Sequence, residues 1–291
     1  MSTTYPNWVF SEAQPVAWTK LKYTREAVNN AAKKLVVYNT TPGFEMDIYD
    51  EYQGALPIIN NWRSSHAFPL NTFRQTLINL SGKVDSKYLT AQRITRLSSI
   101  SLKLERFPGM KLTQMQDIGG CRAVVQSVNK VRSLHEEYIA SRVKHKIVHV
   151  DDYIKSPRES GYRGVHIIWR YHSDRSEEYN GLKIEMQIRS IRQHAWATAV
   201  ETVGTFLQQA LKSSIGEQPW LRFFSLMGTA IARKERTMLV PGTPKNYKEL
   251  LSELKNYAKT LDVENRLAAF GAALKISMEE NALQDAAYFL L

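Results

Sequence analysis

The sequence predicts an α+β protein in which a mixed β-sheet is flanked by helices and extended by helical segments at both ends. Two observations favour this class. Residues 1–82 and 216–291 carry apolar residues at three- and four-residue spacing, which is typical of amphipathic helices. Residues 83–215 instead alternate short apolar runs with a helical segment, and neighbouring antiparallel strands mixed with crossover helices are typical of α+β sheets.

The N-terminal region is expected to be helical. Breaks are expected at Thr41-Pro42-Gly43 and at Phe68-Pro69, because proline and glycine interrupt helices. The predicted helices are Arg25–Tyr38, Met46–Arg63 and Phe68–Leu80.

The central region begins with a segment from Ser86 to Arg106 that we expect to be one long helix, ended by Pro108-Gly109. Strands and one helix then follow. The polar stretch from Asp174 to Gly181 predicts a hairpin-type connection between the last two strands. The predicted strands are Cys121–Gln126, Lys146–Tyr153, Gly164–Tyr171 and Leu182–Ile188, and the predicted helix is Lys130–Ser141.

The chain returns to helix after Ser190. Pro241-Gly242-Thr243-Pro244 is the expected break in this part. The last four residues, Tyr288-Phe289-Leu290-Leu291, are apolar, which predicts either a final packed strand or helix or a natural chain that continues past Leu291. The predicted helices are Ile191–Leu211, Trp220–Arg236 and two within Tyr247–Ile276.

The composition is that of a globular protein, with 291 residues, 43% hydrophobic and 23% charged. Because no apolar run approaches the roughly 20 residues that span a bilayer, and the N-terminus resembles no secretory signal, we expect a cytoplasmic protein with no membrane partner. The single cysteine, Cys121, lies in an apolar strand and is expected to be a small buried residue. The net charge of +11 favours polyanionic partners.

Two acidic residues on separate strands are the candidate catalytic and metal-binding residues. Asp117 precedes Gly119, Gly120 and Arg122, and Glu185 lies in a later strand. Acids hold magnesium, while arginines and backbone amides neutralise phosphates, so this set suits a magnesium–nucleotide site. The competing interpretation is a pair of strand-end acids in unrelated salt bridges.

The segment from Ser86 to Leu112 concentrates positive charge, with six basic residues against the single acid Glu105. On the predicted helix, one face carries phosphate-binding candidates, and Arg93 extends it one turn earlier. A solvated basic face is the simpler alternative. The candidates on this face are Arg96, Ser99, Lys103 and Arg106.

In chain order these motifs resemble the synthetase domain of the RelA/SpoT family, the alarmone synthetases. The family pattern is a basic helix R-x-K-x-x-x-S-I-x-x-K, then D-I-A-G-x-R, D-Y-x-x-x-P-K-x-N-G-Y-x-S-x-H and E-x-Q-I-R-T, and then a Trp-Ala pair. The matching residues are Arg93, Ser99, Ile100, Lys103, Asp117, Gly120, Arg122, Asp152, Tyr153, Pro157, Gly161, Tyr162, His166, Glu185, Gln187, Ile188, Arg189, Trp196 and Ala197.

The resemblance implies a nucleotidyltransferase-like core over residues 83–215 and a Mg²⁺-dependent pyrophosphokinase. Such an enzyme moves the β,γ-pyrophosphate of ATP to the ribose 3′-hydroxyl of GDP or GTP. Asp117 and Glu185 would hold the metal, with Glu185 alternatively acting as the base. Arg93, Arg96, Ser99, Lys103, Arg106 and Arg122 would bind ATP. The acceptor would be bound by Arg158, Tyr162, His166, Gln187 and Arg189, with the Tyr162 ring exposed for stacking on the base. Glu201 is a candidate for the acid that follows the Trp-Ala pair.

The sequence departs from the family pattern in its substrate contacts. Thr95 stands in the place of a lysine, Ser160 replaces an asparagine and Gly164 a serine. The stretch ahead of the motifs is short and no His-Asp dipeptide occurs, which implies a stand-alone small synthetase without a hydrolase domain.

Two alternatives to guanosine nucleotide synthesis stay open at this stage. A toxic relative, of a toxin–antitoxin or phage-defence kind, would modify the 3′-terminal adenosine of tRNA or make adenosine alarmones, and the basic charge and Thr95 favour it. A non-catalytic nucleotide or RNA sensor is the alternative of another class. The helical flanks would suit an antitoxin, a regulatory protein or a second copy of the chain.

Overall fold

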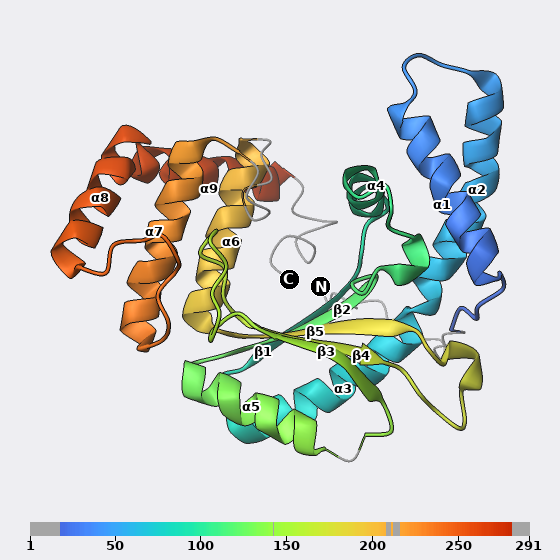
Figure 1. The fold of residues 1–291 in the computed structure, drawn as a ribbon, viewed down its shortest axis with the longest axis horizontal. Helices are drawn as coiled ribbons and strands as arrows, with labels where there is room; N and C mark the ends of the chain where they lie inside the picture. The colour runs from blue at the N-terminus through green and yellow to red at the C-terminus, as the bar shows by residue number, and fades with distance from the viewer. Residues whose placement is uncertain (1–17, 142, 208–210, 212–215, 281–291) are drawn as a thin grey trace, which may run out of the picture.

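A five-stranded mixed sheet lies at the centre of the described part of the chain (Figure 1). The computed structural model describes residues 18–280, except 142, 208–210 and 212–215. The strand order is β1-β2-β5-β4-β3; β2 pairs with β5 in parallel, and the other pairs are antiparallel. The predicted α+β class is therefore confirmed. The strands are β1 (Leu89–Ile94), β2 (Gly119–Val125), β3 (Lys146–Asp152), β4 (Val165–Arg170) and β5 (Lys183–Ser190).

Helices precede, interrupt and follow the sheet, close to the predicted positions. The turn between α2 and α3 lies at His66, and α3 then contains Pro69 in its first turn, where a missing N–H is tolerated. The helices are α1 (Arg25–Thr40), α2 (Met46–Ser65), α3 (Ala67–Val84), α4 (Leu97–Arg106), α5 (Val128–Ala140), α6 (Ile191–Phe206), α7 (Gln218–Glu235), α8 (Tyr247–Thr260) and α9 (Val263–Glu280).

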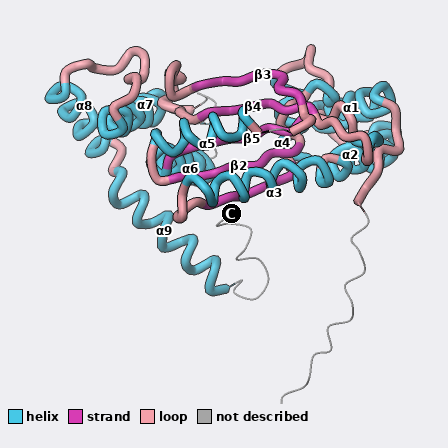
Figure 2. Tube along the Cα trace, turned by 90° about the horizontal axis from the view of Figure 1, so that it is seen from below, coloured by secondary structure: helices cyan, strands magenta, loops and turns pink. Residues whose placement is uncertain are grey.

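The two faces of the sheet have different environments because side chains alternate along each strand. On β5, Ile184, Met186 and Ile188 are fully buried in the main hydrophobic core. Figure 2 shows α3 and α5 lying across this face of the sheet. Residues 185, 187 and 189 of the same strand point to the opposite face, where α4 and α6 lie (Figure 1).

A second hydrophobic core holds the C-terminal helices together. Trp196 and Val203 of α6 pack with Trp220 and Phe224 of α7 and with residues at the start of α9. Ser190 ends β5 and also caps α6, since its side chain accepts a hydrogen bond from the Gln193 N–H. The helical bundle therefore begins directly at the end of the central strand.

The predicted long helix from Ser86 to Arg106 is wrong. Its first half forms β1, which pairs with β2 from Leu89 opposite Val124 to Ile94 opposite Gly119, and only Leu97–Arg106 is helical. The edge position of β1 explains the failure. An edge strand is half exposed and needs no continuous apolar run, so pairing with β2 overrides a local pattern that suits helix equally well.

The apolar C-terminus Tyr288–Leu291 lies outside the described residues, as do residues 208–210 of the predicted helix Ile191–Leu211. Within the described ranges, no helix is both long and apolar enough to cross a bilayer. The division into residues 1–82, 83–215 and 216–291 stays a proposal; helices of the first part share the main core with the sheet.

Phe73 of α3 tests the contribution of the helical layer to the main core. Its side chain is fully buried, 5.8 Å from the Trp169 ring of β4 (centroid to centroid). We expect Phe73→Ala to lower the free energy of unfolding by about 3–5 kcal/mol, measured by urea denaturation. Leu102→Ala, at a side chain that is 66% exposed on α4, is the control, with an expected change within about 0.5 kcal/mol. Equal losses of unfolding free energy in the two variants would contradict the placement of Phe73 in the main core.

Candidate active site

Strands β2 and β5 form the floor of the candidate site. Their parallel register places Gly120 beside Glu185 and Arg122 beside Gln187. A side chain at Gly120 would lie over this floor, where its Cβ would meet only the Glu185 carbonyl oxygen, at 3.7 Å. Glycine thus keeps the space in front of the Glu185 carboxylate open.

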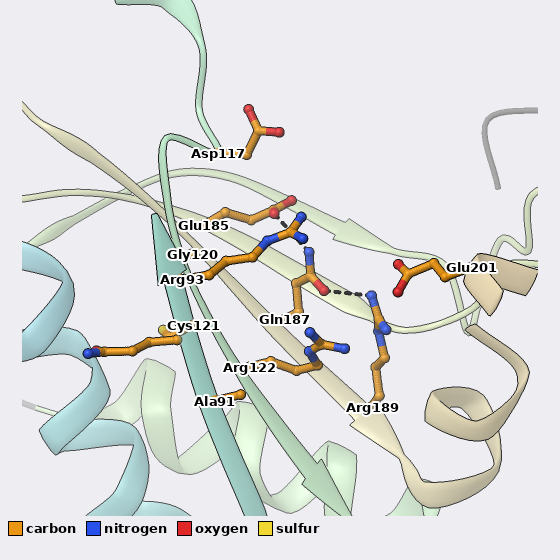
Figure 3. Close-up of a pocket in the computed structure, with 11 residues that line it drawn as sticks. Ala91, Arg93, Asp117, Gly120, Cys121, Arg122, Glu185, Gln187, Arg189 and Glu201 are labelled. Atoms are coloured by element: carbon orange, nitrogen blue, oxygen red, sulfur yellow. Dashed lines mark hydrogen bonds between the residues drawn. The ribbon is translucent and has the colours of Figure 1, made fainter. Parts of the chain in front are cut away.

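A pocket lies on this floor and combines acids with arginines (Figure 3). Figure 3 shows Glu201 of α6 on the Arg189 side of the pocket and Asp117 at the other end. Of the predicted site residues, Arg93, Asp117, Arg122, Glu185, Gln187 and Arg189 are brought together here. The complete lining is Ala91, Gln92, Arg93, Asp117, Gly120, Cys121, Arg122, Glu185, Gln187, Arg189 and Glu201.

Asp117 is held in place by α4 and by the end of β1. Lys103 Nζ lies 2.7 Å from Asp117 Oδ1, and both side chains are about one-third exposed. The Thr95 hydroxyl donates to the Asp117 carbonyl oxygen, and the Thr95 N–H donates to the Ile118 carbonyl oxygen at 2.8 Å. Thr95, which stands where the family pattern has lysine, therefore fixes the backbone that carries Asp117.

Glu185 is a partly buried carboxylate with two hydrogen-bond partners. His166 Nδ1 lies 2.9 Å from Oε1, and Gln187 Nε2 donates to Oε2 at 2.8 Å. Burial alone would raise the pKa of Glu185, but the hydrogen bond and charge of His166, the Gln187 amide and the charge of Lys103 outweigh it and lower the pKa to about 2. Glu185 is therefore ionised at neutral pH.

Five side chains of the site form a closed ring of hydrogen bonds. Arg189 NH2 donates to the Tyr162 hydroxyl at 2.8 Å and to Gln187 Oε1 at 2.6 Å. The Tyr162 hydroxyl bonds His166 Nε2, and His166 and Gln187 both bond Glu185. Each member therefore has two partners in the ring, which fixes the orientation of the Glu185 carboxylate.

The expectation that Tyr162 is exposed is wrong. Its side chain is only 4% exposed and belongs to the second hydrophobic core. Its ring lies edge-on to Trp196, with centroids 6.2 Å apart, and its hydroxyl also accepts from Arg189 Nε at 3.1 Å. The residues that pack on this tyrosine are distant in the sequence, so its sequence neighbours gave no sign of burial.

Three arginines give the pocket its positive charge. Arg93 enters from β1, Arg122 from β2 and Arg189 from β5. Burial lowers the pKa of Arg122, and repulsion from Arg189 and Arg93 lowers it further, against the attraction of Glu201. Arg122 Nε and Arg189 NH1 are buried and have no hydrogen-bond partner within the described residues. Such donors suit an anionic ligand.

The basic segment contributes to the pocket through fewer residues than expected. Arg93 is on β1, so the predicted helical face running from Arg93 through α4 does not exist. Arg96 precedes α4 and is exposed, as is Ser99, and the Arg106 guanidinium lies 5.3 Å from the centre of the Phe107 ring. None of these last three lines the pocket.

Arg158 also lies outside the pocket lining. Its guanidinium stacks over the Tyr153 ring at 4.3 Å from the centroid and donates to the Tyr153 hydroxyl. Asp152, matched to the family motif, binds Arg132 at 2.6 Å and caps the turn at Ile154, which is a structural role.

Sequence reasoning did not identify Ala91 and Gln92 as lining residues, because they lie on the strand that was read as helix. Glu201, weighed only as a counterpart of a family acid, does line the pocket. The acid Glu201 among Ala197, Val200 and Val203 of α6 was the available signal. His194 of the same helix also reaches the sheet, with its Nδ1 3.4 Å from Arg122 NH1.

The acids of the pocket fit a magnesium ion that also binds a phosphate ligand. Magnesium in nucleotide sites takes one or two carboxylates and completes its shell with water and phosphate oxygens. Asp117 and Glu185 supply two carboxylates. The Lys103 ammonium group, which is paired with Asp117, shows that a cation is favoured at this carboxylate. In the described ranges no three His, Cys, Asp or Glu side chains gather as a metal site.

Residues 92–204 match the model of the region found in RelA / SpoT proteins. We refer to this matching stretch as the RelA/SpoT region. It begins inside β1 and ends inside α6, so it contains the pocket floor, Asp117 and Glu201 but not α7 to α9.

Two curated relatives match part of the chain. The chain is 32% identical over 108 residues to the GTP pyrophosphokinase YjbM of Bacillus subtilis, covering 36% of this chain and 51% of the relative. It is 31% identical over 121 residues to the GTP pyrophosphokinase YwaC of the same organism, covering 38% and 54%. The chain thus spans about half the length of the curated relatives it matches.

Solved structures agree with the fold. Small alarmone synthetase 2 of Bacillus subtilis superposes with a TM-score of 0.52 at 20% identity, covering 61% of this chain and 94% of that one. Small alarmone synthetase 1, crystallised with its product pppGpp, gives 0.50 at 21% identity, covering 58% and 88%. At these identities the likeness concerns the fold.

The lowered pKa of Glu185 predicts a pH-dependent contribution to stability. A carboxyl whose pKa is depressed on folding stabilises the protein above its unfolded pKa and loses this effect as pH falls toward the folded value. We expect wild type to exceed Glu185→Gln in unfolding free energy near neutral pH, and the difference to shrink between pH about 4.5 and about 2. Urea titrations at several pH values measure it; a difference that is constant with pH would contradict the assignment.

Proposed function

We propose that the RelA/SpoT region transfers the β,γ-pyrophosphate of ATP to the ribose 3′-hydroxyl of GDP or GTP, forming guanosine tetra- or pentaphosphate and AMP. The observation that carries the proposal is the pocket that joins Asp117 and Glu185 to three arginines. Both curated relatives are named GTP pyrophosphokinases, and one structural neighbour was crystallised with pppGpp, which supports the same reaction.

On the donor side, Arg93 and Arg122 would bind ATP phosphates. Positively charged groups that are already in position stabilise the charge on a transferring phosphoryl group and hold it in line with the acceptor. Lys103, which is paired with Asp117, would turn from this carboxylate to a phosphate. Arg96, Ser99 and Arg106 on the α4 side would act as outer contacts to ATP.

Asp117 and Glu185 would hold a magnesium ion, which would supply positive charge to stabilise the transferring phosphates. The pKa of about 2 favours this role for Glu185 over that of a general base, because an effective base has a pKa near the working pH. The proton of the 3′-hydroxyl would then leave to another acceptor, such as water.

On the acceptor side, His166, Gln187 and Arg189 would contact the guanosine nucleotide, and Arg158 would approach from the loop after β3. The Tyr162 ring is covered, so stacking on the base would require this loop to move. Without such movement, the Tyr162 hydroxyl would orient Arg189 and His166 toward the acceptor.

The test uses the purified chain, Mg²⁺ and ATP labelled on its β- and γ-phosphates, with GDP, GTP, ATP or deacylated tRNA as separate acceptors. Label that moves to GDP or GTP supports the proposal. Label in tRNA or in an adenosine nucleotide would reject a guanosine acceptor and support the activity described above for the toxic relatives. Binding without transfer to any acceptor would leave a nucleotide sensor.

The acids should be essential. We expect Asp117→Asn and Glu185→Gln each to reduce label transfer by at least about a thousandfold, since each removes a carboxylate that would hold the magnesium ion at the reacting phosphates. Circular dichroism and thermal denaturation check that the variants are folded. Turnover near the wild-type rate in either variant would remove that residue from the mechanism.

Tyr162→Phe separates the hydroxyl group from the packing of the ring. It keeps the buried ring and removes the partner of Arg189 and His166. We expect the KM for the guanosine acceptor to rise about tenfold while the KM for ATP changes by less than about twofold. Tyr162→Ala should add a loss of stability, because it opens a cavity in the second core. Equal effects on both substrates would contradict an acceptor-side role.

A further inference from the structure

The loop between β3 and β4, residues 153–164, connects the candidate site to α7. We call it the acceptor loop, since it carries Arg158 and Tyr162. Its last four residues, Gly161 to Gly164, are all buried, although loops usually lie at the surface. On one side Tyr162 joins the hydrogen-bonded ring of the site, and on the other the loop packs on α7.

The acceptor loop and α7 touch backbone to backbone. A Cβ on Gly161 would lie 2.7 Å from the Phe224 carbonyl oxygen, and a Cβ on Gly228 would lie 2.7 Å from Gly161 Cα and 2.8 Å from its carbonyl oxygen. Gly161 also has φ +95°, which favours glycine. Only glycine at both positions permits this approach.

A buried carboxylate on α7 fastens the same loop. Glu235 Oε2 lies 3.2 Å from Arg163 NH1, and the two side chains are 2% and 1% exposed. Glu235 also accepts from the Gln193 amide at 3.0 Å and from the Ser190 hydroxyl, which joins β5 to α6. One residue of α7 thus ties the acceptor loop to the end of the strand that carries Glu185.

We propose that α7 sets the conformation of the acceptor loop, with Gly228 and Glu235 as positioning residues for the guanosine acceptor. Both lie outside residues 92–204, so the RelA/SpoT region depends on a helix beyond its own limits to complete the acceptor side. The contacts run from Glu235 through Arg163 to the neighbouring Tyr162 and then to Arg189 and His166. The inference rests on the proposed function for the identity of the ligand, but not for the structural coupling.

The first test compares two Gly→Ala substitutions inside helices. Gly228→Ala places a methyl group against the Gly161 backbone, whereas Gly54→Ala in α2 meets nothing within 4 Å. Both raise helix propensity. We expect amide hydrogen exchange in residues 153–164 to accelerate about tenfold in Gly228→Ala and to stay unchanged in Gly54→Ala, because local opening sets the exchange rate. Unchanged exchange of the loop in Gly228→Ala would overturn the proposal.

The second test compares two Glu→Gln substitutions in ion pairs of α7. Glu235→Gln weakens the tie to Arg163, whereas Glu253→Gln weakens the pair with Arg222, 2.6 Å apart, which does not touch the loop. We expect Glu235→Gln to accelerate exchange of residues 153–164 and to raise the KM for GDP about tenfold, with the KM for ATP within about twofold. Glu253→Gln should change neither.

The two readouts separate failure of the inference from failure of the proposed function. Faster loop exchange in Gly228→Ala and Glu235→Gln, with no pyrophosphate transfer to guanosine nucleotides by wild type, would keep the coupling and reject that acceptor. Equal increases of both KM values would indicate a general loss of structure and overturn the positioning role. If Glu235→Gln fails to fold, Gly228→Ala alone decides the outcome.

Discussion

The parallel pairing of β2 with β5 is the constraint on which the rest of the site depends. Parallel neighbours cannot be joined by a tight turn, so the chain between them must make a long excursion. Here the excursion supplies α5, β3, the acceptor loop and β4 before β5 returns beside β2. The pairing therefore brings Gly120 and Arg122 beside Glu185 and Gln187, and it places the acceptor loop beyond one end of the same strands.

The buried apolar residues form two hydrophobic cores that support different parts of the site. The main core, under the sheet, makes a rigid floor from apolar residues of β2, β4 and β5 and from α3 and α5. The second core is formed by apolar residues of α6 to α9 together with Tyr162. None of its buried residues in the described part of the chain comes from a strand. The donor-side residues on β1 and β2 thus depend on the first core, whereas the acceptor loop contributes to both, through Ile154 in the first and Tyr162 in the second.

Much of the fold could be predicted from local patterns, and the failures have identifiable causes. Strands β2 to β5 and most helices were predicted because their apolar periodicity is strong and because glycine or polar residues bound them. β1 was missed since LTAQRI satisfies its backbone through β2, which no local pattern reveals. In the site, the motif residues on β2 and β5 gather as expected because strand alternation is regular. The burial of Tyr162 arises from packing against the C-terminal helices, and the role of Thr95 arises from its hydrogen bond to the Asp117 carbonyl oxygen; a motif pattern reveals neither tertiary contact.

The ring formed by Glu185, His166, Tyr162, Arg189 and Gln187 has a consequence for how this protein can change over evolutionary time. A closed ring has no terminal member, so a replacement at any position leaves two broken ends rather than one. The losses from two replacements in the same ring are then expected to overlap instead of adding. Selection would then act on the five residues together, and single substitutions in the ring would be rare unless several positions change at once.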